Sequence, residues 1–328
     1  MENEGNDTVD SATLLPALRA GLTKGLRGTV WMLKILLPCS FLTFIIEASG
    51  LLSHLDFLLA PAMGFLSLPP EATLPLLAGL LAGIYGAVAA LAVLDLNLTA
   101  TILVAVFLLI SHNLIQEGVV QARSGLNFFK ATVTRLAASV ATVLVLARLL
   151  PESAALAPAM AAPSQAATPF GVLLRAWIWD TGILSLKIFA IISAMMVVME
   201  LLRVLRVIPL LARMLRPVLW LMGLSPRVGV LWLTAAVFGL TYGAAVIVEE
   251  AREGHFHKDE IEHLQLSIGI NHALIEDPAI FLALGIPALW LWGPRLLAAL
   301  VTVHCHRLWA GWRTHQRRRL QTKAIAGS

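Results

Sequence analysis

Charged residues are scarce in this chain, at 13% of its 328 residues, whereas 58% of the residues are hydrophobic. Soluble globular proteins carry about 25% charged residues, so this composition excludes a soluble enzyme. No charge lies between Glu71 and Asp95, and similar uncharged runs fill 96–116, 228–248 and 278–294. Runs of this kind approach the roughly 20 residues that cross a hydrocarbon core. Because a backbone in lipid must satisfy its own hydrogen bonds, the sequence predicts an all-α integral membrane protein whose first partner is the lipid bilayer.

Cysteine is also rare, with only two residues in the chain. Cys39 and Cys305 both lie in apolar segments, which excludes a disulfide framework and a thiolate metal cage. The basic residues behind the net charge of +4 lie at the ends of apolar segments, where they act as topology signals. Nucleic acid is therefore not predicted as a partner. A P-loop is absent, and no pattern predicts a cofactor.

An internal duplication is the most informative feature of the sequence. SHNLIQEG at 111–118 matches NHALIEDP at 271–278, and GIYGAVAAL at 83–91 matches GLTYGAAVI at 239–247. The offset between matched positions grows only from 153 to 160, so the two halves stay in register. The matched polar pairs are Lys34 with Lys187, Glu47 with Glu200, Tyr85 with Tyr242, His112 with His272, and Arg135 with Arg295.

The duplication predicts two repeats of about five membrane segments each. In the first repeat these segments are 29–52, 55–66, 72–94, 98–116 and about 131–150. An odd number of crossings inverts the second repeat, and inverted repeats are a transporter architecture with a site near the membrane midplane. We expect the short pieces at 55–66, which contains Pro61, and at 278–292 to be broken or re-entrant helices. The predicted divisions are a cytoplasmic N-terminal segment 1–28, a first repeat 29–150, an Ala/Pro-rich extracytoplasmic linker 151–169, a second repeat 170–312 and a basic cytoplasmic tail 313–328.

Polar residues that recur in both repeats are the candidate site residues, because polar groups within membrane segments are costly and call for a reason. The i, i+4 spacing predicts that His112 shares a helical face with Gln116, and His272 with Glu276. Gly118 and Pro278 are expected to mark helix breaks. We expect the two His-containing helix ends and the two Tyr-Gly positions to converge on one polar region. The residues assigned to solute contact are Tyr85, Gly86, His112, Asn113, Tyr242, Gly243, Asn271 and His272.

A second set of polar residues is assigned to ion or proton coupling. Glu47 and Glu200 occupy the same repeat position and are expected to face each other across the pseudo-twofold axis. Alternatively, Glu47 lies at a helix interface and Glu200 pairs with Arg203 or Arg206. The coupling residues are Glu47, Gln116, Glu117, Glu200, Glu276 and Asp277.

Three further polar patterns have a structural alternative. The Tyr-Gly pairs are also compatible with small-residue helix packing. The His-containing helix ends are also compatible with polar termini at the membrane surface. The loop at 255–263 contains three histidines and acidic residues that could bind a transition metal. No tight ligand motif occurs in that loop, so a solvated cytoplasmic loop is the favoured interpretation and no metal site is predicted.

At TYGAAVIVEEAREG, 241–254, followed by NHALIEDPAIFLALG, 271–285, the sequence resembles the Gate, or nucleoside-recognition, domain family. That family includes spore maturation membrane proteins, the channel region of ferrous-iron transporters and relatives of concentrative nucleoside transporters. The resemblance covers both halves, and the second half is the closer to the family pattern. The resemblance implies a membrane protein, from a family whose members handle unlike solutes.

The leading functional hypothesis is a secondary transporter or permease of the cell inner membrane, with both termini cytoplasmic. It would move a small polar solute, nucleoside-like or a small anion or cation, with a coupling ion or proton, and could form a homo-oligomer. The alternative is a non-transporting membrane scaffold similar to spore maturation proteins. An intramembrane enzyme ranks third, because the sequence shows neither a nucleophile with a general base to activate it nor a convincing catalytic metal. Water access to the paired polar residues discriminates the first two hypotheses.

The inverted topology can be tested by cysteine labelling from either side of the membrane. After Cys39 and Cys305 are replaced, a cysteine at Ser164 should react only from outside and one at Arg318 only from the cytoplasm. Labelling of both positions from the same side would contradict the inverted arrangement.

Overall fold

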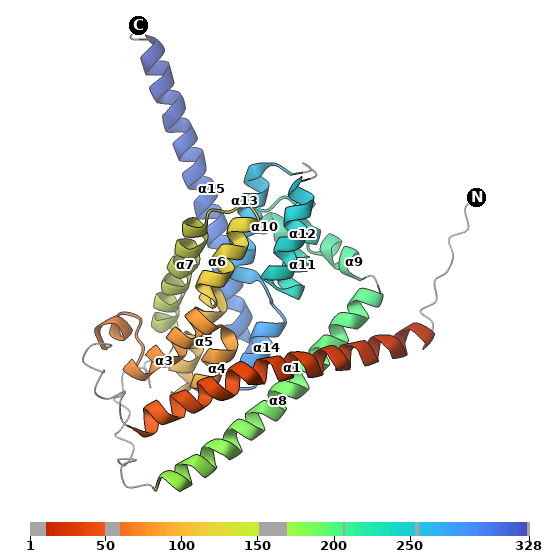
Figure 1. The fold of residues 1–328 in the computed structure, drawn as a ribbon. Coiled ribbons are helices and arrows are strands. Elements are labelled where there is room, and N and C mark those ends of the chain that lie inside the picture. Colours follow the sequence, from red (N-terminus) through yellow and green to blue (C-terminus); the bar gives the residue numbers. More distant parts are fainter. Residues whose placement is uncertain (1–10, 50–59, 151–168, 206, 253–255, 327–328) are drawn as a thin grey trace.

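The computed structural model describes residues 11–49, 60–150, 169–205, 207–252 and 256–326. Over these ranges the chain is helical and contains no β-strand (Figure 1). Within the described residues, five helical stretches are long and apolar enough to cross a membrane, and one of them includes both α5 and α6. This agrees with the predicted integral membrane protein. These candidate spans are Leu14–Ala48, Leu98–Arg123, Phe128–Leu149, Phe170–Leu202 and Ala288–Trp312.

The helices follow the duplication in their order along the chain. The first half contains α1 (Ser11–Ala48), α3 (Thr73–Ala82), α4 (Ile84–Leu91), α5 (Leu98–Ser111), α6 (Leu114–Arg123) and α7 (Phe128–Leu149). The second half contains α8 (Phe170–Val204), α9 (Ile208–Met214), α10 (Arg216–Leu221), α11 (Gly229–Phe238), α12 (Leu240–Arg252), α13 (Lys258–Asn271), α14 (Glu276–Leu282) and α15 (Ala288–Ala326). Two single 3-10 turns, Pro70–Ala72 and Pro226–Val228, precede α3 and α11.

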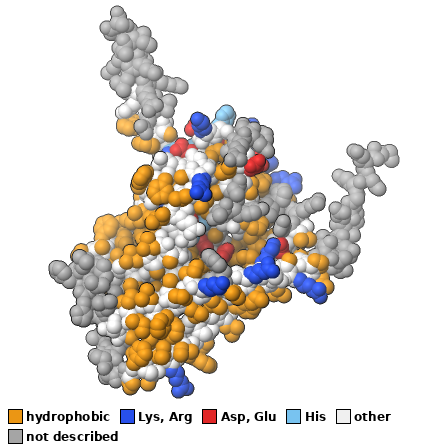
Figure 2. All heavy atoms as spheres, viewed as in Figure 1, with side chains coloured by type: hydrophobic (Ala, Val, Ile, Leu, Met, Phe, Trp, Pro, Cys, Tyr) orange, Lys and Arg blue, Asp and Glu red, His pale blue; other side chains and the backbone are white. Residues whose placement is uncertain are grey.

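Helices α5 and α13 form the centre of the bundle. Most side chains of α5 and the second half of α13 are buried, and both helices contact α7 and α15 (Figure 1). Large apolar side chains remain exposed on the outer helices, and Figure 2 shows hydrophobic side chains over much of the surface. An apolar exterior around a polar centre suits a protein whose surroundings are lipid.

The predicted span at 72–94 is broken at Gly83, which separates α3 from α4 with φ 90°. The same break recurs at Gly239, which separates α11 from α12 with φ 85°. Both values are positive, a backbone conformation that glycine adopts without steric cost. The surroundings of the two glycines differ. A Cβ on Gly83 would lie 2.7 Å from the Asn113 side chain, whereas no described atom lies within 4 Å of one on Gly239.

A second pair of breaks separates α5 from α6 and α13 from α14. The chain turns at Asn113 with φ 48° and at Ala273 with φ 45°. Backbone bonds from Asn113 N–H to Gly79 O, 3.0 Å, and from Ala273 N–H to Ala235 O, 3.2 Å, stabilise these turns. The breaks therefore precede the positions that the sequence suggested. Contrary to expectation, Gly118 and Pro278 lie inside α6 and α14.

The observed helix ends agree with some of the other predicted boundaries and differ from others. The piece 278–292 is broken, because α14 ends at Leu282 and α15 begins at Ala288. Of the piece 55–66, residues 55–59 lie outside the described residues, and 60–65 are helical. Helix α1 begins before residue 29 and α15 continues beyond residue 312, so no helix end marks either predicted division. The predicted linker falls outside the described residues up to position 168.

The long helices α1 and α8 lie side by side in antiparallel directions (Figure 1). Near one end of the pair, the backbones approach so closely that a Cβ on Gly25 would lie 2.6 Å from the Ser193 Cα. Further along, Trp177 Nε1–H donates to Ser40 Oγ at 3.0 Å. Glycine in α1 thus permits close helix packing, as small residues do in membrane bundles.

The substitution Gly25→Ala should separate α1 from α8 and lower the free energy of unfolding by about 1–3 kcal/mol through overpacking. Gly28→Ala is the matched control, because the nearest atom to its Cβ would be Ile192 Cγ2 at an ordinary 3.7 Å. The control should be neutral or stabilising, since alanine favours helix over glycine. Unfolding in detergent, followed by circular dichroism, measures both. Equal effects of the two substitutions would contradict the close packing.

Candidate functional site

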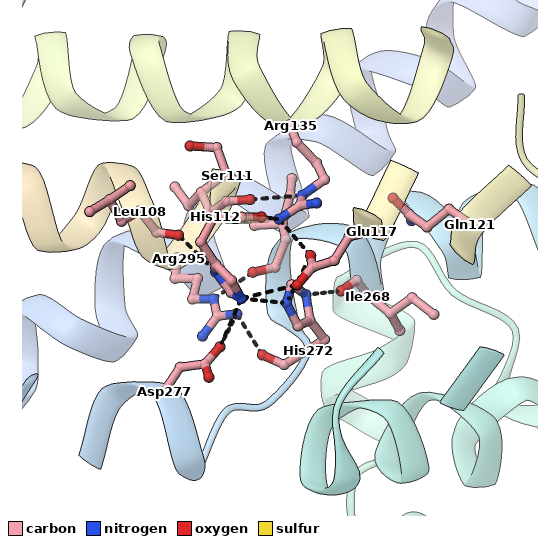
Figure 3. Close-up of polar contacts among 12 residues, drawn as sticks. Leu108, Ser111, His112, Glu117, Gln121, Arg135, Ile268, His272, Asp277 and Arg295 are labelled. Carbon is pink, nitrogen blue, oxygen red and sulfur yellow. Dashed lines mark hydrogen bonds and ion pairs between the residues drawn. The ribbon is translucent and has the colours of Figure 1, made fainter. Parts of the chain in front are cut away.

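Two histidines meet where α5 and α13 end (Figure 3). The ring centroids of His112 and His272 are 5.0 Å apart, and their Nε2 atoms are 3.4 Å apart. Each Nδ1 lies 2.9 Å from a carbonyl oxygen of its own helix, Leu108 O or Ile268 O. Both side chains are nearly fully buried within the protein.

Two buried arginines hold the ends of these helices. Arg135, on α7, donates from Nε to Ile110 O at 3.0 Å and from Nη2 to His112 O at 2.8 Å. Arg295, on α15, makes the corresponding two bonds to the Ile270 and His272 carbonyls. The last carbonyls of a helix have no intrahelical partner, and here a guanidinium fork satisfies them.

Two carboxylates complete the cluster. Glu117, on α6, lies 2.7 Å from Arg135 Nη2, 3.0 Å from His112 Nε2 and 3.2 Å from His272 Nε2. Asp277, on α14, lies 3.6 Å from His112 Nε2 and 4.0 Å from Arg295 Nη2. With neutral histidines the four remaining charges balance. We call this cluster of His112, Glu117, Arg135, His272, Asp277 and Arg295 the ionic centre.

Several buried polar atoms in and near the ionic centre have no hydrogen-bond partner. They are Nη1 of Arg135, Nη1 of Arg295, Oδ2 of Asp277 and both side-chain polar atoms of Asn271. Buried polar groups are almost always paired, so such atoms need an explanation, for example a bound ion or water.

A second polar region lies on the α14 side of the ionic centre. Tyr85 Oη–H donates to Glu276 Oε1 at 2.5 Å, joining α4 to α14. Glu276 also lines a cavity of about 380 Å³, and Figure 2 shows a hollow above α1 with charged side chains around it. Lys24 and Glu200, which form an ion pair, lie in the same wall. The remaining lining residues are Met195, Met196, Met199, Thr234, Val237, Phe238 and Val246.

The structure brings together part of the predicted site. His112, His272, Glu117 and Asp277 meet in the ionic centre, and Asn271 is fully buried beside His272 in the chain. Gln116 is exposed and does not share a helical face with His112, because the helix breaks between them. His272 and Glu276 are separated by the corresponding break, so the predicted i, i+4 faces are wrong.

The Tyr-Gly positions separate into contact and packing roles. Tyr85 reaches Glu276, whereas the side chain of Tyr242 lies outside the described residues. A Cβ on Gly86 would lie 3.3 Å from Ala78 O, and one on Gly243 would lie 2.7 Å from Ala235 Cα. Both glycines therefore serve close helix packing, and Asn113 packs against Gly83.

Glu47 and Glu200 do not face each other, because they lie toward opposite ends of the antiparallel α1 and α8 pair. Glu200 pairs with Lys24 of α1. Glu47 lines a separate cavity of about 140 Å³ with Trp177 and Asp180. The two glutamates are equivalent in the sequence duplication, but they lie at separate locations in the structure.

The histidine-rich loop has structural roles in its described part. The backbone N–H of His257 donates to Glu260 Oε2 at 3.0 Å and caps α13. This bond, followed by one from Ser225, lowers the pKa of Glu260. Stability from the cap is thus present above the usual carboxyl pKa and is lost as pH falls through the lowered value. Glu262 pairs with Lys130, and the His263 ring lies against His306.

Comparison with known proteins supports the membrane assignment. Residues 29–125 match the Gate family model, which is described as nucleoside recognition. We call residues 29–125 the Gate-matched segment. It extends from α1 to α6 and supplies Tyr85, His112 and Glu117. The match lies in the first half of the chain, so the expectation that the second half is closer to the family pattern is wrong.

The chain is also similar to a relative from Bacillus subtilis (strain 168) named "Uncharacterized membrane protein YvoD". The two are 27% identical over 302 residues, which cover 90% of this chain and 95% of the relative. No solved structure matches the chain significantly. The similarity to YvoD extends well beyond the Gate-matched segment. It covers residues of the ionic centre from both halves of the chain.

Arg135 and Arg295 were not assigned to the site from sequence. Their equivalence in the two halves, within otherwise apolar segments, was the signal that could have identified them. Both are among the largest fully buried side chains described.

The substitution Arg135→Lys should lower the free energy of unfolding by about 3–5 kcal/mol, because an ammonium group cannot reproduce the fork that holds Ile110, His112 and Glu117. Arg148→Lys, at an exposed position of the same helix, is the control and should change stability by less than about 0.5 kcal/mol. Unfolding by a denaturing detergent measures both. A small effect of Arg135→Lys would show that the guanidinium geometry is not required.

Proposed function

We propose that the protein is a transporter or permease for a small polar solute, located in the cell inner membrane with both termini cytoplasmic. The observation that carries this proposal is the ionic centre, which joins matched residues of the two halves inside an apolar bundle. A charged cluster at such depth is costly and is characteristic of ion and substrate pathways. Among the described residues, no arrangement of groups supports an enzyme more strongly than a transporter.

We infer that the two halves are inverted repeats. In support, His112 and His272 bond equivalent carbonyls, Arg135 and Arg295 hold equivalent helix ends, and the glycine breaks recur. Broken helices that meet near the middle of the bundle are typical of transporters built from inverted repeats. The breaks also provide hinges at which the halves could change their relative position.

The cavity beside Glu276 is the proposed solute site. Its wall offers one lysine, two glutamates and a threonine hydroxyl among methionine and phenylalanine side chains. Such a lining suits a small molecule with both polar groups and an apolar surface, for example a nucleoside-like solute. Tyr85, which belongs to the Gate-matched segment, donates a hydrogen bond to Glu276 in this wall. Asp277, the next residue of α14, belongs to the ionic centre.

The alternative, a non-transporting scaffold, is favoured by the burial of the ionic centre. Its histidines, arginines and carboxylates are almost inaccessible to solvent and form several ion pairs. A scaffold would need these contacts only to join the two halves. The unpartnered atoms of Asn271, Asp277 and both arginines support transport instead, because a purely structural centre should pair them.

The transport proposal predicts that Glu276→Gln abolishes uptake with little loss of stability, because the amide keeps the shape but removes the charge from the cavity wall. The solute is first selected by thermal stabilisation of the protein across nucleosides, carboxylates and metal ions. Uptake of that solute into proteoliposomes is then measured.

Glu262→Gln is the control, because Glu262 is likewise a half-buried glutamate with a polar partner, Lys130, but does not line this cavity. It should leave uptake nearly unchanged. If the two substitutions had the same effect, or if no solute crossed the membrane with the unaltered protein, the scaffold would be favoured.

A further inference from the structure

We propose that the ionic centre binds one divalent transition-metal ion through His112, His272, Glu117 and Asp277. This inference does not rest on transport, because binding can be measured at equilibrium in detergent. It extends the roles predicted for these residues from solute contact and coupling to direct metal ligation.

The proton positions on the two imidazole rings are fixed by their outer contacts. Leu108 O and Ile268 O can only accept hydrogen bonds, so each Nδ1, at 2.9 Å, carries the proton. In the neutral rings each Nε2 then presents a lone pair to the other histidine. A backbone carbonyl that holds the outer ring nitrogen is the usual arrangement around metal-ligating histidines.

Acceptor atoms therefore converge, and Arg135 Nη2 donates to one of them, Glu117 Oε2, at 2.7 Å. The two Nε2 atoms are 3.4 Å apart, and carboxylate oxygens of Glu117 lie 3.0 Å from one and 3.2 Å from the other. Asp277 Oδ2, which has no hydrogen-bond partner, lies 3.6 Å from His112 Nε2. Lone pairs at these distances repel one another unless a cation lies between them.

The separations match those around a tetrahedral ion. Ligand atoms about 2.0–2.1 Å from such an ion lie about 3.3 Å from one another. The two Nε2 atoms, 3.4 Å apart, are close to this value. His112 Nε2 lies 3.0 Å from Glu117 Oε1 and His272 Nε2 lies 3.2 Å from Glu117 Oε2, so each histidine is near this distance from a different oxygen of the same carboxylate. Ligand atoms of these three residues all lie within 4.8 Å of one another, and all three side chains are buried.

The charges around the site select the kind of ion. Arg135 contacts Glu117, and Arg295 lies near Asp277, so the two carboxylates are already largely neutralised. Mg²⁺ and Ca²⁺ depend on anionic oxygen ligands and are disfavoured here. Ions that bind imidazole nitrogen well, such as Zn²⁺, Co²⁺ and Fe²⁺, gain from the two histidines and are favoured.

A shared proton is the rival occupant. A proton on His112 Nε2 could bridge to Glu117 or to His272. It would leave the 3.2 Å contact between His272 Nε2 and Glu117 Oε2 as one between two acceptors. A metal ion accounts for all of these contacts, which is why we favour it.

The test is Co²⁺ binding to the full chain in detergent after chelation, with Zn²⁺ and Mg²⁺ as comparison ions. We expect one Co²⁺ per chain with the intense visible absorption of a tetrahedral complex, displacement by Zn²⁺ and no displacement by Mg²⁺. The double variant His112→Ala/His272→Ala should lose this absorption and reduce Co²⁺ affinity by at least tenfold. If it does not fold, His272→Gln retains a donor toward Ile268 and replaces it in the test.

The matched control is His263→Ala/His306→Ala, which removes a second adjacent pair of imidazoles from α13 and α15. It should retain both the absorption and the affinity. Absence of tetrahedral Co²⁺ binding by the unaltered protein would overturn the proposal and favour the shared proton. Loss of binding in the control alone would also overturn it, by placing the metal at His263 and His306.

Discussion

The guanidinium forks of Arg135 and Arg295 are the contacts on which the rest of the centre depends. Each break after α5 or α13 leaves helix carbonyls without partners inside an apolar bundle, where water cannot satisfy them. The arginines donate to these carbonyls, and Arg135 also fixes Glu117. Because the same backbone positions carry the histidines, holding the helix ends also fixes the two imidazoles. Stability and the arrangement of the candidate site therefore come from the same hydrogen bonds.

The positions of the breaks explain why the polar residues converge. Without the turns at Asn113 and Ala273, α5 and α13 would continue past each other, and Glu117 and Asp277 would lie a full turn away along their helices. The turns redirect α6 and α14, so that acidic residues on new helices face the histidines of the preceding ones. A membrane helix that is broken inside the protein can thus present side chains from both of its parts to one point.

The sequence predicted the helical membrane fold and, through the duplication, four residues of the ionic centre. It did so because a polar residue in an apolar segment is conspicuous, as with His112 and Glu117. The continuous helical faces were mispredicted because an αL turn at Ala273 has no local signal, and alanine ordinarily favours helix. Lys24 was not anticipated as a partner of Glu200, and the side chains of Arg203 and Arg206, which the sequence also offered, lie outside the described residues. Lys24 lies 176 residues away, and no local pattern indicates which long helices pack together.

The two glycine breaks differ in a way that the shared sequence pattern conceals. Gly83 is blocked by the Asn113 side chain, whereas the space around Gly239 is open. A Cβ at Gly83 would collide with an amide that packs there, whereas one at Gly239 would meet no described atom within 4 Å. Equivalent positions are thus hindered to unequal degrees. The second half therefore contains the less hindered of the two equivalent breaks.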